Sequence, residues 1–275
     1  MKKILIFFCF ISLTLNAQKS ETRSTGDFDK IRSVSGGHIV YHLSEVPKVV
    51  VEYTEAADLK EVETRTENKT LVIKIPKAEK KPHLKNLKIH VYGNTLQKIE
   101  VGSGTAFKIQ DELHLTSLNL VQNGSCEVDM GPGLHVKDLK VDIQSHAILK
   151  GNVISENISG LIKTYSIWES NIKTDNIRLD IQKSSIVSLE GNAQKIYLNV
   201  TGSSIANTLK LTALKAELIS EGSSVVESWV TGSLNAKAQN TSQILIKGEP
   251  NFTGITTRNM GLIANKNGKT YSNTF

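Results

Sequence analysis

The stretch that decides the fold is 183–204, which reads KSSIVSLEGNAQKIYLNVTGSS and both begins and ends with a small, hydroxyl-rich turn. Turns of this kind follow β-type runs about eight times between residues 99 and 248. A strand-rich pattern that repeats about every twenty residues predicts a solenoid. The last residues of the turns are Thr105, Ser125, His146, Ser166, Ser185, Ser204, Ser224 and Ser242, at intervals of 20, 21, 20, 19, 19, 20 and 18 residues.

Apolar residues alternate with polar ones before each turn, as in Ile196, Leu198 and Val200. This period of two is typical of half-buried strands. We predict an all-β fold, a single-stranded, right-handed parallel β-helix in which about eight rungs of about 20 residues stack on one another. The column directly after the turns is apolar or small at seven of its eight positions, and we expect it to face the core. Its members are Ala106, Cys126, Ala147, Ile167, Ile186, Ile205, Val225 and Gln243.

The two ends of such a stack need covering, because open sheet edges pair with other strands. Residues 27–98 are predicted to form several strands, including an antiparallel hairpin around the turn at 67–69. These strands would cap the first end. The repeats are expected to occupy 99–248. Since Pro250 has no backbone N–H, pairing should stop there, and 249–275 should form a C-terminal cap or tail.

The first residues have the pattern of a secretory signal peptide. Two lysines precede an apolar run at 4–15, which is too short to span a bilayer, and LNA at 15–17 is a suitable cleavage site. We therefore expect residues 1–17 to be removed and the polar segment 18–26 to be flexible. Removing two lysines and no acidic residue lowers the formal charge from +6 to +4 (6 − 2).

Cys126 is then the one cysteine of the mature chain, so no intramolecular disulfide is expected there. It belongs to the expected inward column, which favours an inert buried thiol over a reactive one. No later stretch approaches eighteen consecutive apolar residues, so no transmembrane segment is predicted. The protein is expected to act in the periplasm, at the cell surface or in the medium.

Several short segments resemble one known family. They are GDFDKIRSVSGGHIVYHL at 26–43, VGSGTA at 101–106, VTGSSI at 200–205, SEGSSV at 220–225 and IKGEP at 246–250. Together they resemble the putative auto-transporter adhesin, head GIN domain family of bacterial envelope proteins, over roughly residues 27–260. The resemblance implies a single-stranded parallel β-helix and brings no catalytic motif with it.

Parallel β-helices include polysaccharide lyases and glycosidases, in which a pair of carboxylates would be the catalytic groups. Asp142 and Asp180 each stand in the segment Asp-Ile-Gln, about two rungs apart. Two rungs span about 10 Å, near the upper limit for an inverting acid and base. The short, regular repeats leave no room for loops that would build a cleft. We therefore predict no catalytic residue and no enzyme, with a β-helical carbohydrate-active enzyme as the alternative.

His114 and His135 are 21 residues apart and are expected to stack on adjacent rungs, both facing outward. Stacked histidines can share a metal ion. The next repeat offers no third ligand at the same height, so an exposed polar ladder is the favoured interpretation. No metal and no cofactor are predicted.

Trp168 and Trp229 are candidates for stacking on sugars. Lys80 and Lys81, within the basic stretch 74–88, are candidates for contacts with anionic glycans. Nucleic acid is not expected as a partner, because no aromatic platform accompanies these lysines. We predict an exported, non-catalytic binding or structural module, adhesin-like, that presents a β-helical face to an envelope or host glycan or protein. The sequence leaves the ligand and the oligomeric state open.

Overall fold

The computed structural model describes residues 19–53, 56–78, 80–81, 83–84 and 87–272, so the predicted signal peptide at 1–17 lies outside the described residues. The protein is an all-β solenoid of about nine turns, where the repeats predict about eight. Its N-terminal elements are β1 (Lys19–Ser24), β2 (Lys30–Ser33), β3 (His38–Leu43), β4 (Lys48–Tyr53), α1 (Ala56–Leu59), β5 (Glu63–Glu67), β6 (Thr70–Lys74) and β7 (Lys88–Gly93).

The remaining strands build the long part of the coil. They are β8 (Lys98–Gly102), β9 (Ala106–Ile109), β10 (Leu113–Asn123), β11 (Glu127–Asp129), β12 (Leu134–Gln144), β13 (Ile148–Lys163), β14 (Ile167–Gln182), β15 (Ile186–Thr201), β16 (Ile205–Glu221), β17 (Val225–Gln239), β18 (Gln243–Lys247), β19 (Asn251–Arg258), β20 (Leu262–Asn265) and β21 (Thr270–Tyr271).

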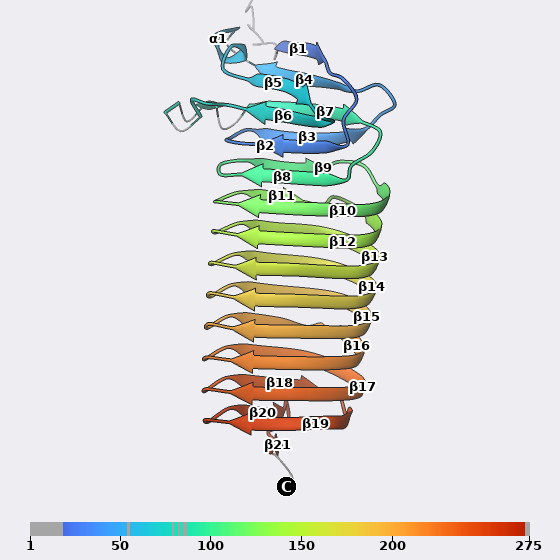
Figure 1. Ribbon diagram of the computed structural model, residues 1–275, viewed down its shortest axis with the longest axis vertical. Coiled ribbons are helices and arrows are strands. Elements are labelled where there is room, and N and C mark those ends of the chain that lie inside the picture. Colours follow the sequence, from blue (N-terminus) through green and yellow to red (C-terminus); the bar gives the residue numbers. More distant parts are fainter. Residues whose placement is uncertain (1–18, 54–55, 79, 82, 85–86, 273–275) are drawn as a thin grey trace, which may run out of the picture.

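The coil is right-handed and parallel (Figure 1). Strands on the near side run to the left, and the chain returns to the right on the far side as it descends. Each rung pairs in parallel with the next, as β13 does with β14, β14 with β15 and β15 with β16. The left edge in Figure 1 consists of tight turns, such as 164–166, which we call corners, and the right edge consists of wider bends, such as 172–176.

The first rungs do not stack in sequence order. β2 pairs in parallel with β6 on one side and with β8 on the other, and β3 pairs in the same way with β7 and β9. The rung made of β2 and β3 therefore lies between the β6–β7 rung and the β8–β9 rung (Figure 1). This order places Ile31 in register with both Leu71 and Ile99, so the N-terminal rungs share one core with the repeats.

Antiparallel strands cover the first end. β4 pairs with β7, β1 pairs with β4, and β5 pairs with β6 around a two-residue turn. Residues 19–24, which the sequence predicts to be flexible, are strand β1, because their backbone pairs with β4. The Arg23 guanidinium anchors this strand by donating hydrogen bonds to the carbonyl oxygens of Leu59 and Val62.

The coil continues beyond Gly248, where the sequence predicts that the repeats stop. β19 pairs in parallel with β17, and β20 pairs in parallel with β18. Pro250 precedes the first residue of β19, so its missing N–H lies outside the ladder and does not interrupt the pairing. β21 then pairs antiparallel with β20 at this second end.

Each corner from 145–147 to 240–242 contains two left-handed residues followed by a buried one, whereas the corners that end at Thr105 and Cys126 have one left-handed residue each, Gly104 and Gly124. At 164–166, Thr164 and Tyr165 have φ angles of 61° and 60°, and Ser166 is fully buried. Two consecutive residues with positive φ reverse the chain, as in a type I′ turn, and the third re-enters the sheet with its side chain inward. The buried residues that the backbone pairing brings into register are Thr105, Cys126, Ala147, Ser166, Ser185, Ser204, Ser224 and Ser242.

The inward column predicted from the sequence is therefore wrong by one residue over most of its length. Ile186, expected in the core, is 38% exposed, whereas Val187 is fully buried. The residue in register with Ser166 is Ala147 and not the turn residue His146. Aligning the turns by their chemical similarity therefore places this rung one residue away from its true register. The other members that prove half-buried or exposed are Ala106, Ile167, Ile205, Val225 and Gln243, while Cys126 and Ala147 are buried as expected.

Backbone groups satisfy the buried hydroxyls. Ser185 Oγ accepts a hydrogen bond from Ser166 N–H at 3.2 Å. Ser224 Oγ accepts one from Glu221 N–H at 3.0 Å and donates to the Val200 carbonyl oxygen at 2.8 Å. A buried polar group without a partner is costly. A small hydroxyl side chain fits here because it fills the corner and bonds the turn at the same time.

Apolar side chains form continuous columns along the axis. One column consists of Val128, Leu149, Trp168, Val187, Ala206, Val226, Ile244 and Ile263, all fully buried. The indole N–H of Trp168 donates to Ser170 Oγ at 2.8 Å, so the one polar atom of this side chain is satisfied inside the core. Stacking buries the apolar face that a single rung would leave exposed.

The corrected register can be tested with two neighbouring substitutions. We expect Val187→Asp to lower the free energy of unfolding by more than about 4 kcal/mol, because it places an unpaired charge in the core. Ile186→Asp, whose side chain faces outward, should cost less than about 1 kcal/mol. Urea unfolding followed by circular dichroism measures both values, and the reverse order of sensitivity would contradict this register.

Candidate functional site

Asp142 and Asp180 lie on one outward column, two rungs apart, with Leu161 in register between them. Gln144 Nε2 donates to Asp142 Oδ1 at 2.7 Å, and Asn199 Nδ2 donates to Asp180 Oδ1 at 2.8 Å. Two rungs span about 10 Å, just beyond the separation of an inverting acid and base. Amides engage both carboxylates and an apolar side chain separates them, so the pair does not have the geometry of a glycosidase acid and base.

Three potential metal ligands meet at the start of β10 and β12. His114 and His135 are in register on adjacent rungs, and their ring centroids are 4.4 Å apart, which agrees with the stacking predicted from the sequence. Glu112 immediately precedes β10, and its Oε1 lies 3.2 Å from His114 Nε2 and 2.9 Å from His135 Nε2. We call these three residues the histidine site.

The two tryptophans and the cysteine are poorly placed for a ligand. Trp168 is fully buried, so a sugar has no access to it. Trp229 is half-buried, and the ammonium group of Lys247 lies 3.6 Å from its ring centroid. Burial raises the pKa of the Cys126 thiol to about 11, so the thiol is protonated at neutral pH and is a poor nucleophile.

The basic stretch is partly neutralised by an acidic side chain. Glu61 Oε1 lies 2.9 Å from Lys77 Nζ and 3.1 Å from Lys81 Nζ, and these two hydrogen bonds lower the pKa of Glu61. Lys80 is exposed. Lys81 therefore already has an anionic partner, which leaves Lys80 as the better placed of the two predicted lysines for an anionic ligand.

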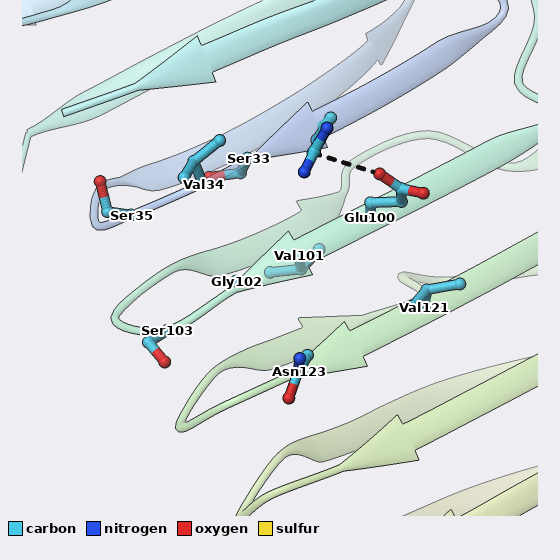
Figure 2. A pocket seen from close by; sticks show the side chains of 10 residues that line it. Ser33, Val34, Ser35, Glu100, Val101, Gly102, Ser103, Val121 and Asn123 are labelled. Atoms are coloured by element: carbon cyan, nitrogen blue, oxygen red, sulfur yellow. Dashed lines mark ion pairs between the residues drawn. The ribbon is translucent and has the colours of Figure 1, made fainter. Parts of the chain in front are cut away.

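A hollow of about 470 Å³ lies along the corner edge, where the ends of β2, β8 and β10 meet (Figure 2). Arg32 Nε and Glu100 Oε2 form an ion pair across it at 3.4 Å, and Ser35, Ser103 and Asn123 supply small polar groups at the corners. Its ten lining residues include no aromatic side chain. Since its two charges neutralise each other, this hollow offers few groups that would orient a ligand.

Two other hollows lie next to each other along the bends, and we treat them together as one groove. Their volumes are about 190 Å³ and about 300 Å³, and both are lined by Asn157 and Ser159. We call the combined surface the bend groove. It extends from Asn119 on β10 to Glu217 on β16, which is about 24 Å at 4.8 Å per rung. The residues that mark its six successive rungs are Asn119, Lys140, Ser159, Arg178, Tyr197 and Glu217.

Polar side chains are linked along the bend groove. Asn176 Nδ2 donates to Asn157 Oδ1 at 3.0 Å, and Asn157 Nδ2 donates to Asp138 Oδ1 at 2.9 Å. On the next column, the Arg178 guanidinium lies 3.9 Å from the centre of the Tyr197 ring. The groove thus combines a flat aromatic and guanidinium surface with amide donors and acceptors, which is a suitable lining for a polar, extended ligand.

Outward β-branched side chains form a second regular surface, which we call the isoleucine ladder. It consists of Ile148, Ile167, Ile186, Ile205 and Val225, which are in register on consecutive rungs. All five are half-buried or exposed. β-branched neighbours on adjacent strands stabilise a sheet through mutual packing, and this accounts for the apolar column that the sequence assigned to the core.

A histidine pair lies in the N-terminal rungs. His42 Nε2 and His90 Nδ1 are 2.9 Å apart, and His90 Nε2 lies 3.2 Å from Glu52 Oε1. The His42 ring stacks on Tyr92, with their centroids 4.7 Å apart. Burial lowers the pKa of His42, the nearby His90 lowers it further, and Asp111 acts in the opposite direction.

A family model matches most of the chain. The family is described as "Putative auto-transporter adhesin, head GIN domain", and its model matches residues 27–161 and 144–250. The chain belongs to this family. The two overlapping matches cover the N-terminal rungs from residue 27 as well as the repeats up to residue 250.

Solved structures share the head GIN coil. A putative adhesin from Parabacteroides merdae has a TM-score of 0.64 at 14% identity, covering 90% of this chain and 95% of that chain. A putative adhesin from Parabacteroides distasonis has a TM-score of 0.63 at 15% identity, covering 90% of this chain and 96% of that chain. A putative lipid binding protein from Parabacteroides distasonis has a TM-score of 0.59 at 22% identity, covering 90% of this chain and 96% of that chain. At these identities the likeness shows the fold alone.

No curated protein matches the chain in sequence. Within the described ranges, no helix is long and apolar enough to cross a membrane.

Two features of these surfaces were not predicted from the sequence. Glu112 stands two residues before His114, and this proximity was the signal that a carboxylate accompanies the histidines. Arg178 and Tyr197 are 19 residues apart, which is one repeat, and that interval was the signal that the two side chains lie on adjacent rungs.

Acidification is expected to destabilise the protein through His42. Because the pKa of His42 is lower in the folded state, the unfolded chain binds this proton more tightly. The contribution of His42 to stability is complete above the unfolded pKa of about 6.5 and is lost as the pH falls below it. We expect the drop in Tm between about pH 7.5 and about pH 5 to be smaller in His42→Gln than in the native protein. Thermal unfolding measures the drop, with the exposed His146→Gln as control, and an equal drop in all three proteins would contradict the assignment.

Proposed function

We propose that this head GIN domain protein is an exported, non-catalytic binding module, adhesin-like, whose ligand lies in the bend groove. The observation that carries the proposal is that two adjoining hollows, which share Asn157 and Ser159, together follow six rungs from Asn119 to Glu217. The adhesin description of the family and the predicted signal peptide at 1–17 support export to the envelope or beyond.

The same region argues against catalysis. Between residues 148 and 221 the chain consists of β13 to β16 joined by tight corners, so this segment contributes no long loop that would cover the groove and exclude water. The carboxylates of Asp142 and Asp180 are each hydrogen-bonded to an amide, and Leu161 stands between them. An open, straight and rigid groove is better suited to holding a ligand than to transforming it.

The lining favours an extended, hydroxyl-rich polymer, and we propose an envelope or host glycan. The Asn176–Asn157–Asp138 ladder uses one N–H of each amide internally, so each amide keeps a second N–H for a ligand hydroxyl. The Tyr197 ring with the Arg178 guanidinium provides a flat surface against which a sugar ring can pack. A groove of about 24 Å spans several sugar units, and contacts repeated along the rungs would then add up.

Glycan binding can be tested with matched aromatic variants. We expect the native protein to bind a subset of glycans on an array, and Tyr197→Ala to weaken that binding about tenfold, equivalent to about 1.4 kcal/mol. Asn176→Ala should weaken the same interactions. Tyr165→Ala is the control, because Tyr165 is 59% exposed on the corner edge, away from the groove. Binding that depends on Tyr165 and not on Tyr197, or binding of proteins alone, would contradict a glycan in the bend groove.

The non-catalytic assignment has a separate test. When the protein is incubated with polysaccharides, including any glycan that it binds, no new reducing ends are expected, because Asp142 and Asp180 do not have the geometry of an acid and base pair. Reducing-end assays with Asp142→Asn and Asp180→Asn as companions decide the matter. Release of reducing ends by the native protein that disappears in either variant would establish the alternative, a carbohydrate-active enzyme.

A further inference from the structure

The histidine site brings three potential metal ligands together, and the proposed glycan binding does not involve them. We infer that Glu112, His114 and His135 together bind one divalent transition-metal ion of the zinc type, with one coordination position left open to solvent. This inference is independent of the proposed glycan binding, since none of its three ligands lines the groove.

The spacing of the three ligand atoms is close to that of a metal site. Zinc binds imidazole nitrogen and carboxylate oxygen at about 2.1 Å, so neighbouring ligand atoms of a tetrahedral site are about 3.4 Å apart. Glu112 Oε1 lies 3.2 Å from His114 Nε2 and 2.9 Å from His135 Nε2, and all three ligand atoms lie within 4.8 Å of one another. Small rotations of the side chains would bring the two imidazole nitrogens to the ligand spacing.

The backbone holds the ligands in place before any ion arrives. His114 and His135 are directly in register in the parallel pairing of β10 with β12, which continues to Asn123 and Gln144. Leu113 N–H donates to the Gly133 carbonyl oxygen at 3.0 Å, which secures the start of the same two rungs. Ligands carried on paired strands lose little conformational freedom on binding, and this preorganisation favours affinity.

The donor set selects the kind of ion. Two imidazoles with one carboxylate suit zinc and its first-row neighbours, whereas calcium and magnesium prefer sites made of oxygen alone. The side chains of His114 and Glu112 are 70% and 56% exposed, so an ion and its water have direct access.

A glycine keeps the space beside the ligands open. A β-carbon at Gly133 would lie 3.4 Å from Glu112 Cγ and 3.6 Å from His135 Nε2, which are ordinary van der Waals contacts, so a side chain at this position would lie directly beside the ligands. Three protein ligands with open space beside them match the pattern of a zinc site that keeps one exchangeable position.

Without a metal, the same contacts are close polar contacts of two imidazoles with one carboxylate, and they are ion pairs only when the imidazoles are protonated. The two interpretations differ in a measurable way, because such a cluster of polar contacts has no preference among divalent ions. The test is isothermal titration of the purified protein with zinc chloride, cobalt chloride and calcium chloride, together with the visible absorption of the cobalt complex.

We expect one equivalent of zinc to bind, cobalt to give the intense visible bands of a tetrahedral nitrogen and oxygen site, and calcium not to compete. His114→Ala, His135→Ala and Glu112→Gln should each weaken zinc binding at least tenfold, because each removes a direct ligand. His114→Ala is the decisive variant, since the side chain is exposed and its loss leaves the fold intact, as circular dichroism will verify. His146→Ala, which removes an exposed histidine elsewhere, is the control and should bind zinc as the native protein does.

Several results would overturn the inference. They are the absence of zinc binding, zinc binding that none of the three variants weakens, and equal binding of zinc and calcium. Loss of zinc binding in His146→Ala together with normal binding in His114→Ala would place the ion elsewhere and would equally refute this site. Because the glycan array measures a different surface, failure of one proposal leaves the other standing.

Discussion

Parallel backbone pairing between successive rungs is the constraint on which this structure depends. A rung of about twenty residues has an apolar face that it does not bury by itself, so each rung is stable only against its neighbours. Pairing sets the spacing between rungs at about 4.8 Å and aligns side chains into columns that are either wholly inward or wholly outward. The fully buried column through Leu149, Trp168 and Val187 shows how tightly those columns pack.

The corners are where this constraint is hardest to satisfy. Two left-handed residues reverse the chain, and at several corners neither of them is glycine, as with Thr164 and Tyr165. Such conformations are unfavourable for ordinary residues, so the neighbouring rungs must hold them in place. The buried serine that follows contributes to this support, since its hydroxyl bonds the backbone of the corner. The buried hydroxyl at the end of such a turn is therefore part of the core, whereas the left-handed residue before it, such as Tyr165, is exposed.

The same alignment determines which side chains are neighbours on the surface. Residues one repeat apart become neighbours, which brings His114 beside His135 and Arg178 beside Tyr197. Neither pair requires a loop, so both are as rigid as the sheet that carries them. Because β13 to β16 follow one another through tight corners, the surface that they form is straight and open, and its contacts repeat along the axis. Those features suit the recognition of an extended ligand better than the enclosure that catalysis requires.

The sequence by itself determined the all-β solenoid, its period and the stacking of the two histidines, because alternation and repeat length are properties of the chain alone. It did not determine which of two adjacent apolar residues in a strand faces the core. Ile186 and Val187 are both β-branched and apolar, and only the pairing of neighbouring rungs decides which of them is buried. Tertiary structure also decided that the β2–β3 rung lies between rungs that come later in the chain, and that Pro250 does not end the coil. Likewise, Glu112 contacts His135, which is 23 residues away in the sequence, because β10 pairs with β12. In each case the outcome depends on contacts between segments distant in sequence, and local patterns do not specify those contacts.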